Sequence, residues 1–211
     1  MDKLHAHWIS TWADCALAPP PGLLERLLAA WREPQRHYHT LQHLEECLAL
    51  FDALREEARR PAELALALWF HDAVYDVRAH DNEARSAQWA VQALQAAGLA
   101  RESCARVEAL IMATCHGAAP PPDLASPAAA DIALLTDIDL AILGAPTARF
   151  AEYERQIRAE YAWVAPAVYL VKRRAVLQGF LARPQLYATP LLHARLERQA
   201  RHNLTNAIDN Y

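Results

Sequence analysis

The sequence contains little glycine, has no closely paired cysteines, and lacks a long hydrophobic run. Of 211 residues only 5 are glycine, and the most apolar window, residues 64–70, is far too short to span a bilayer. The four cysteines are widely spread and form no CxxC pair, which excludes a zinc ribbon and argues against a disulfide framework (Cys15, Cys47, Cys104 and Cys115). The N-terminus has no apolar core of signal-peptide length. We therefore expect reduced thiols, a cytoplasmic location and no membrane partner.

The balance of charge also excludes one class of partner. The formal net charge is −4, so the chain has no general basic field and gives no strong signal for nucleic-acid binding. At 54% hydrophobic residues, the sequence is too apolar for a disordered chain. A chain of this length favours one domain over residues 1–211, with a core of about 30–190 and helical extensions at both ends.

Scarce glycine combined with abundant alanine, leucine, arginine and glutamate favours helix nearly throughout. The 13 prolines divide the chain into helix-sized segments. Residues 64–68 alternate like a strand, but alanine is a poor strand residue and the alternation stops at Trp69, so a buried central helix is preferred. The sequence thus predicts an all-α bundle with helices near 3–16, 22–33, 41–58, 61–75, 83–98, 101–116, 127–143, 147–162, 166–182 and 190–207.

Most of the ten histidines are interpreted as structural or solvated. Four lie in polar terminal segments and are expected at the surface (His5, His7, His193 and His202). Two tryptophans near the N-terminus, Trp8 and Trp12, are interpreted as exposed, which would favour a homodimer interface.

The His71–Asp72 pair stands out because it follows a strongly apolar stretch. An imidazole and a carboxylate at the end of a buried helix cost desolvation energy unless they pair or bind a cation. Taken alone, the dipeptide is more simply a hydrogen-bonded pair near a helix end. Upstream, however, His43 lies one turn after Thr40, an expected N-cap, and downstream two acids interrupt an apolar helix at Asp137 and Asp139.

The order His43, His71–Asp72 and a distant aspartate resembles the HD superfamily of metal-dependent phosphohydrolases. Within it, the chain looks like a predicted single-domain bacterial group, and the resemblance spans about residues 30–190. The stretches that carry it are RHYHTLQH at 36–43, WFHDAVYD at 69–76, DNEARSA at 81–87, and residues 136–144. The resemblance implies a compact HD-domain-like bundle, with a metal site between central helices.

The resemblance also implies the metal ligands His43, His71, Asp72 and one late aspartate. Asp137 and Asp139 lie about 200° apart on a helix, so both cannot face one ion. The family's apolar-x-Asp pattern matches Asp137, which leaves Asp139 as a surface acid or an outer partner of the ligands. Because no thiolate is expected nearby, the donors suit Mn²⁺, Fe²⁺, Co²⁺, Ni²⁺, Zn²⁺ or Mg²⁺ without preference for a softer ion.

The implied activity is release of phosphate from a small phosphorylated molecule, such as a nucleotide, by metal-activated water. Asp72 and Glu83 are the expected catalytic acids, although Glu83 could instead complement a helix dipole in a first turn. Asp76 is a weaker alternative to Glu83. The residues expected to bind substrate, each of which could instead be a solvated charge, a helix-end histidine or a core aromatic, are Arg36, Tyr38, Arg78, His116 and Arg158.

Two other functions remain open from the sequence. A di-iron oxygenase of similar fold would need more histidine ligands, and only His116 offers itself, with Gly117 where a second histidine would be expected. A non-catalytic, metal-dependent nucleotide-binding module would keep the same ligands. Nucleotide P-loop, serine-hydrolase and HExxH motifs are absent, and Cys47, Cys104 and Cys115 are interpreted as buried thiols rather than nucleophiles.

Overall fold

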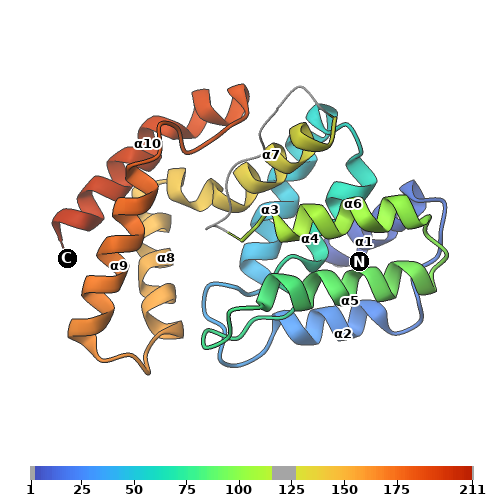
Figure 1. Cartoon of the computed structure of the whole chain (residues 1–211), viewed down its shortest axis with the longest axis horizontal. Helices are drawn as coiled ribbons and strands as arrows, with labels where there is room; N and C mark the ends of the chain where they lie inside the picture. Colours follow the sequence, from blue (N-terminus) through green and yellow to red (C-terminus); the bar gives the residue numbers. More distant parts are fainter. Residues whose placement is uncertain (1–2, 116–126, 211) are drawn as a thin grey trace. The chain divides into compact units, whose positions relative to one another are not determined.

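The computed structural model describes residues 3–115 and 127–210, and every regular element in these two ranges is helical (Figure 1). The prediction of an all-α protein is therefore confirmed. Each described helix corresponds to one of the segments expected from the proline-bounded pattern. Two expected helices end earlier in the α form and continue as short 3-10 helices, after Leu54 and after Asp139.

The backbone groups into two compact units, residues 1–136 and residues 137–211. The prediction of a single domain stays a prediction, since two contact-dense units can belong to one domain. The first unit contains α1 (Lys3–Asp14), α2 (Leu23–Trp31), α3 (Leu41–Leu54), η1 (Arg55–Glu57), α4 (Pro61–Phe70), α5 (Asn82–Ala96), α6 (Arg101–Met112) and most of α7 (Pro127–Asp139). The second contains η2 (Leu140–Gly144), α8 (Thr147–Glu160), α9 (Pro166–Leu181) and α10 (Pro190–Asp209).

Helix α4 is the centre of the first unit. Every residue from Glu63 to Phe70 is buried, and the helix contacts α1, α3, α5 and α6. A helix covered on all sides has no need of a polar face, which explains its unbroken apolar sequence. Pro61 occupies the first helical turn, where its missing N–H costs nothing. The helix ends at Phe70 rather than near residue 75, so His71 occupies its C-cap position.

The N-terminal tryptophans are part of this core, so the interpretation of Trp8 and Trp12 as exposed is wrong. Both are buried, and the Trp8 ring lies edge-on against Trp69 of α4 with centroids 5.0 Å apart. Trp31 adds to the same cluster, because its indole N–H donates to the Trp69 carbonyl at 3.1 Å. A homodimer remains a prediction, but Trp8 and Trp12 no longer support it because they are buried.

In the second unit, α10 is hydrogen-bonded to the segments around it. The Glu197 carboxylate accepts from the backbone N–H groups of Leu186 and Tyr187. The Asn203 amide donates to two carbonyls around η2, at Leu143 and Ala145, both at 2.8 Å. These bonds satisfy backbone groups that would otherwise be buried without partners.

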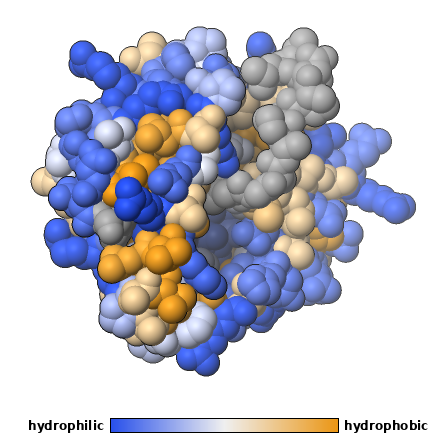
Figure 2. All heavy atoms as spheres, turned by 60° about the vertical axis from the view of Figure 1, so that its left-hand side comes forward, coloured by the Kyte–Doolittle hydropathy of each residue, from blue (hydrophilic) through white to orange (hydrophobic). Residues whose placement is uncertain are grey.

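Helix α9 carries exposed apolar side chains, among them Val168, Val171 and Val176, and Trp163 precedes it. Figure 2 brings forward the side on which Figure 1 draws α8 and α9, and there apolar residues are interspersed with hydrophilic ones. Among the helices within 3–115 and 127–210, none is both long enough and apolar enough to cross a membrane.

Candidate metal centre

His43 is placed by the start of α3. The Thr40 side chain accepts a hydrogen bond from the Gln42 backbone N–H, so Thr40 is the N-cap that the sequence predicts. His43 follows within the first turn and is only 2% exposed. The Tyr38 ring packs against its imidazole with centroids 4.8 Å apart, which restricts the imidazole's orientation.

His71 is oriented by the end of α4. Its Nδ1 lies 2.8 Å from the Leu68 carbonyl oxygen, and a carbonyl can only accept a hydrogen bond. The proton of a neutral imidazole is therefore on Nδ1, which leaves the Nε2 lone pair available to a metal ion. A histidine that binds metal is commonly fixed by such a bond from its other ring nitrogen.

The donor atoms of His43, His71 and Asp72 converge in the first unit. The Nε2 atoms of His43 and His71 are 3.0 Å apart. Asp72 Oδ2 lies 3.2 Å from Nε2 of His71 and 3.7 Å from Nε2 of His43. Ligand atoms about 2.1 Å from one ion, at angles of 90–110°, lie roughly 3.0–3.4 Å from each other. The separations of 3.0 and 3.2 Å lie within this range, and the 3.7 Å between Asp72 and His43 exceeds it by about 0.3 Å, so a small shift of Asp72 would let the three side chains share an ion. The Asp72 side chain is 17% exposed and is the part of the group that contacts solvent.

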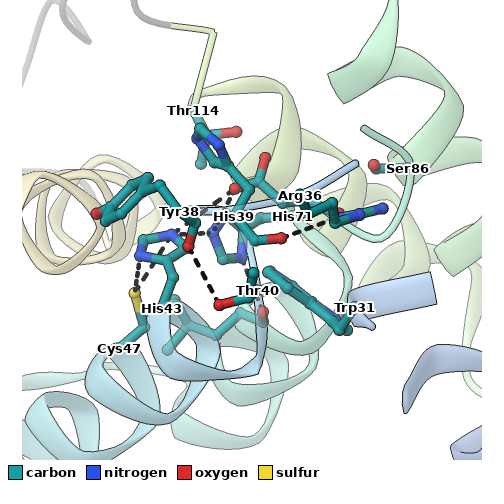
Figure 3. Close-up of polar contacts among 12 residues, drawn as sticks. Trp31, Arg36, Tyr38, His39, Thr40, His43, Cys47, His71, Ser86 and Thr114 are labelled. Carbon is teal, nitrogen blue, oxygen red and sulfur yellow. Dashed lines mark hydrogen bonds and ion pairs between the residues drawn. The ribbon is translucent and has the colours of Figure 1, made fainter. Parts of the chain in front are cut away.

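The structure adds a fourth donor that the sequence analysis did not assign to this place. Cys47 Sγ lies 3.7 Å from Nδ1 and 3.8 Å from Nε2 of His43, and it forms a compact donor group with the two histidines, all within 4.8 Å of one another (Figure 3). The expectation of no thiol near the ligands is thus wrong. A signal was present, because His43 and Cys47 are four residues apart and so share one face of α3.

Arg36 has a structural role in this centre, which competes with its predicted role in binding substrate. Its side chain has no exposed surface. Nη1 donates to the Asp72 carbonyl at 2.6 Å, and Nη2 donates to the Ala73 carbonyl at 3.0 Å. Nε binds the Glu33 carboxylate, and the Trp31 ring lies against the guanidinium. Arg36 therefore holds the turn that presents Asp72.

Aromatic rings surround the two imidazoles. Tyr38 is buried against His43, as in the core-aromatic alternative for this residue. His39 stacks on Tyr75 with centroids 4.0 Å apart, and the Arg36 guanidinium lies over the Tyr75 ring. The loop before α3 and the turn after α4 are therefore packed together on one side of the centre.

Asp137 has hydrogen-bond partners of its own in the second unit. Its carboxylate accepts from the backbone N–H groups of Ala188 and Thr189, at 2.9 and 2.7 Å, and from the Thr189 hydroxyl at 2.6 Å. Burial has the largest effect on this carboxyl group and raises its pKa. The hydrogen bonds lower the pKa by less. Asp137 thus anchors the segment leading into α10, a role that competes with its predicted coordination of a metal.

The remaining predicted residues differ in how they are placed. Glu83 is half-buried in the first turn of α5, as in its helix-dipole alternative, and Ser86 of that helix bonds the backbone of Val74. Arg78 is exposed. Arg158 donates to carbonyls at the end of α8, and its guanidinium lies over the Tyr169 ring, a structural arrangement. His116 lies outside the described residues.

In comparisons with protein-family models, curated proteins and solved structures, none matches this chain significantly. The interpretation of the site therefore depends on its own geometry and on the sequence resemblance.

Proposed function

We propose that the protein is a metal-dependent phosphohydrolase that acts on a small phosphorylated molecule. One observation carries this proposal. His43 and the His71–Asp72 pair, 28 residues apart, bring three donor atoms within 3.0–3.7 Å of each other in a buried setting. They are also the residues, in the same order, that carry the resemblance to HD phosphohydrolases.

The donor set suits the proposed chemistry. A divalent ion bound here would act as a Lewis acid: it would polarise a phosphoryl oxygen and lower the pKa of a water molecule bound to it. Burial limits the access of water to the two imidazoles, while Asp72 is partly exposed and so is the ligand that a substrate would approach. Glu83, on the helix that Ser86 ties to the turn after His71–Asp72, is the candidate acid for proton transfer.

The first experiment compares metal content and phosphate release in wild type, His71→Ala and Asp72→Ala. The protein is stripped with a chelator and reloaded with Mn²⁺, Fe²⁺, Co²⁺, Ni²⁺, Zn²⁺ or Mg²⁺ before a panel of phosphomonoesters and phosphodiesters is tested. Both variants are expected to lose metal and turnover while keeping their helical circular dichroism. His193→Ala, at an exposed position of α10, is the control and is expected to retain both.

Two outcomes would overturn the proposal. The first is turnover at the wild-type rate by metal-stripped His71→Ala. The second is the absence of any hydrolysis by the loaded wild type across the whole panel, which would favour the non-catalytic nucleotide-binding alternative. Two irons per chain with substrate-dependent oxygen uptake would instead indicate the oxygenase alternative.

The late aspartate can be assigned by the same metal measurement. The carboxylate of Asp137 is occupied by Ala188 and Thr189, and Asp139 is buried on the opposite side of its helical turn. Asp137, the predicted ligand, and Asp139 therefore stay the two candidates for the late acid. Asp137→Asn is expected to lower the free energy of unfolding in either case, because its hydrogen bonds to Ala188 and Thr189 are weakened. The variant that also loses metal identifies the late acid, and unchanged metal content in both variants would contradict a late aspartate ligand.

A further inference from the structure

Cys47 differs from an ordinary buried thiol in its neighbours. Cys104, also buried, donates its S–H to the Leu99 carbonyl at 3.6 Å, a common arrangement for a thiol in a core. The Cys47 sulfur lies beside the imidazole of His43, and its donor group includes His71. All three side chains are buried, so sulfur and nitrogen donors are gathered where water has little access.

The distances bring a sulfur atom close to the nitrogen ligands of the same ion. With a metal–nitrogen bond of about 2.1 Å and a metal–sulfur bond of about 2.3 Å, the two donors lie roughly 3.6–3.8 Å apart for angles of 110–120°. Cys47 Sγ lies 3.8 Å from His43 Nε2, within this range, but it also lies 3.7 Å from Nδ1, so the sulfur packs beside the imidazole ring and does not face the Nε2 lone pair directly. The two Nε2 atoms, 3.0 Å apart, correspond to an angle near 90°. The sulfur and the two Nε2 atoms lie within 4.8 Å of one another, so coordination by all three donors requires the Cys47 side chain to turn towards the Nε2 side of His43 when the ion binds.

The geometry points to Cys47 as a thiolate ligand of the metal, together with His43 and His71. This inference rests on the proposed metal site and specifies its ion. Two imidazoles and a thiolate favour Zn²⁺, Fe²⁺, Co²⁺ or Ni²⁺, while Mg²⁺ and Mn²⁺ prefer sites made of oxygen donors. The protein thereby binds a thiophilic divalent ion more tightly than the oxygen-preferring ions that phosphate chemistry often uses.

Cobalt(II) is the direct probe, because a cobalt–thiolate bond absorbs strongly in the near ultraviolet and nitrogen or oxygen ligands do not. The full chain, stripped of metal, is titrated with Co²⁺ as wild type, Cys47→Ser and Cys104→Ser. Wild type and Cys104→Ser are expected to show the thiolate-to-cobalt absorption, and Cys47→Ser is expected to lack it. Zn²⁺ affinity is expected to fall at least about tenfold in Cys47→Ser, with little change for Mg²⁺.

X-ray absorption of the zinc-loaded wild type tests the same bond without a substitution, so a Cys47→Ser protein that fails to fold does not end the test. A sulfur neighbour at about 2.3 Å from zinc is expected. Bound cobalt without thiolate absorption, or bound zinc with only nitrogen and oxygen neighbours, would overturn the role of Cys47 and leave the phosphohydrolase proposal standing. Failure of wild type to bind either ion would overturn both.

Discussion

At the scale of single residues, His7 shows how packing can change the chemistry of a surface-like sequence position. Its segment is polar, and the interpretation of His7 as solvated is wrong. The ring lies against Trp69, whose indole N–H donates to His7 Nδ1 at 3.2 Å, and Nε2 lies 3.4 Å from the Asp52 carboxylate. Burial lowers the pKa of His7 below its ordinary value of 6.5, more than Asp52 raises it.

This arrangement predicts acid sensitivity of the N-terminal helix. An indole can only donate, so a proton on His7 Nδ1 would break the bond to Trp69. Because the folded-state pKa is lower than the unfolded value, the unfolded chain binds the proton more readily. The contribution of His7 to the free energy of unfolding is therefore fully present above pH 6.5, the unfolded-state pKa. It is lost as the pH decreases towards the folded-state pKa of His7.

The measurement is urea unfolding as a function of pH for wild type and His7→Asn. Asparagine can offer an oxygen acceptor near the position of Nδ1 but does not titrate, so the acid decline in stability is expected to be shallower in this variant. His5→Asn, at an exposed position of the same helix, is expected to follow the wild-type profile. Parallel profiles for wild type and His7→Asn would show that His7 does not cause the acid sensitivity.

Arg36 provides a second test at the residue scale. Its planar guanidinium donates in several directions at once, to the carbonyls of Asp72 and Ala73 and to Glu33, which an ammonium group cannot reproduce. Arg36→Lys is expected to lower the free energy of unfolding by about 1–3 kcal/mol. The Zn²⁺ affinity is expected to fall about tenfold or more, because the turn carrying Asp72 loses its support.

Isothermal titration calorimetry and denaturant unfolding measure the two effects. Arg32→Lys is the matched control, because Arg32 is exposed at the end of α2, and its substitution is expected to change stability by no more than about 0.5 kcal/mol. Normal Zn²⁺ affinity in Arg36→Lys would mean that Arg36 supports the fold without orienting the site.

At the scale of secondary-structure elements, the packing of η2 against α10 depends on Gly144. A Cβ placed there would lie 2.7 Å from Leu196 Cβ and 2.9 Å from the Leu196 backbone oxygen. A backbone atom cannot move aside as a flexible side chain can, so any larger residue would push the two elements apart. Gly179, in α9, has no atom within 4 Å of the same position and offers a contrast.

Alanine substitutions at these two glycines are therefore expected to act in opposite directions. Gly144→Ala should lower the free energy of unfolding by about 1–3 kcal/mol through overpacking. Gly179→Ala should raise it by about 0.5–1 kcal/mol, because alanine costs less backbone entropy in a helix. Chemical denaturation of both variants checks the pair, and a tolerated Gly144→Ala would show that α10 has room to move.

At the scale of the whole molecule, the candidate centre joins folding to metal binding. His43 and His71 are separated along the chain by α3, η1 and α4, so the donor atoms meet only when these elements are packed. An ion bound by the folded state and not by the unfolded chain stabilises the fold, by an amount that grows with the logarithm of the ratio of the free ion concentration to the dissociation constant.

Metal should therefore raise the melting temperature of wild type. At a free Zn²⁺ concentration 100 times the dissociation constant, the added stability is about 2.7 kcal/mol. For a chain of this size that corresponds to about 5–10 °C, measurable by differential scanning calorimetry with and without a chelator. The shift should disappear in His43→Ala and His71→Ala. An equal shift in these variants would place the binding elsewhere.

Much of the site could be predicted because its signals are local. Thr40 marks the start of α3, His43 follows by one turn, and the apolar run that ends in His71–Asp72 identifies a buried helix end. Cys47 was missed although its spacing from His43 is a helical one, because a single cysteine in an apolar pattern is most often a core residue. The structural contacts of Arg36 could not be predicted, because the sequence does not show whether a guanidinium faces solvent or backbone carbonyls.

Composition and periodicity were sufficient for the all-helical class, the helix positions and the burial of α4, because these depend on interactions between residues close in the chain. The convergence of His43, Cys47, His71 and Asp72, the partners of Arg36, and the burial of Trp8 and Trp12 depended on long-range packing. Side chains far apart in sequence meet only after helices have docked, and a few ångströms of docking decide whether a histidine, a thiol or an arginine serves chemistry or structure.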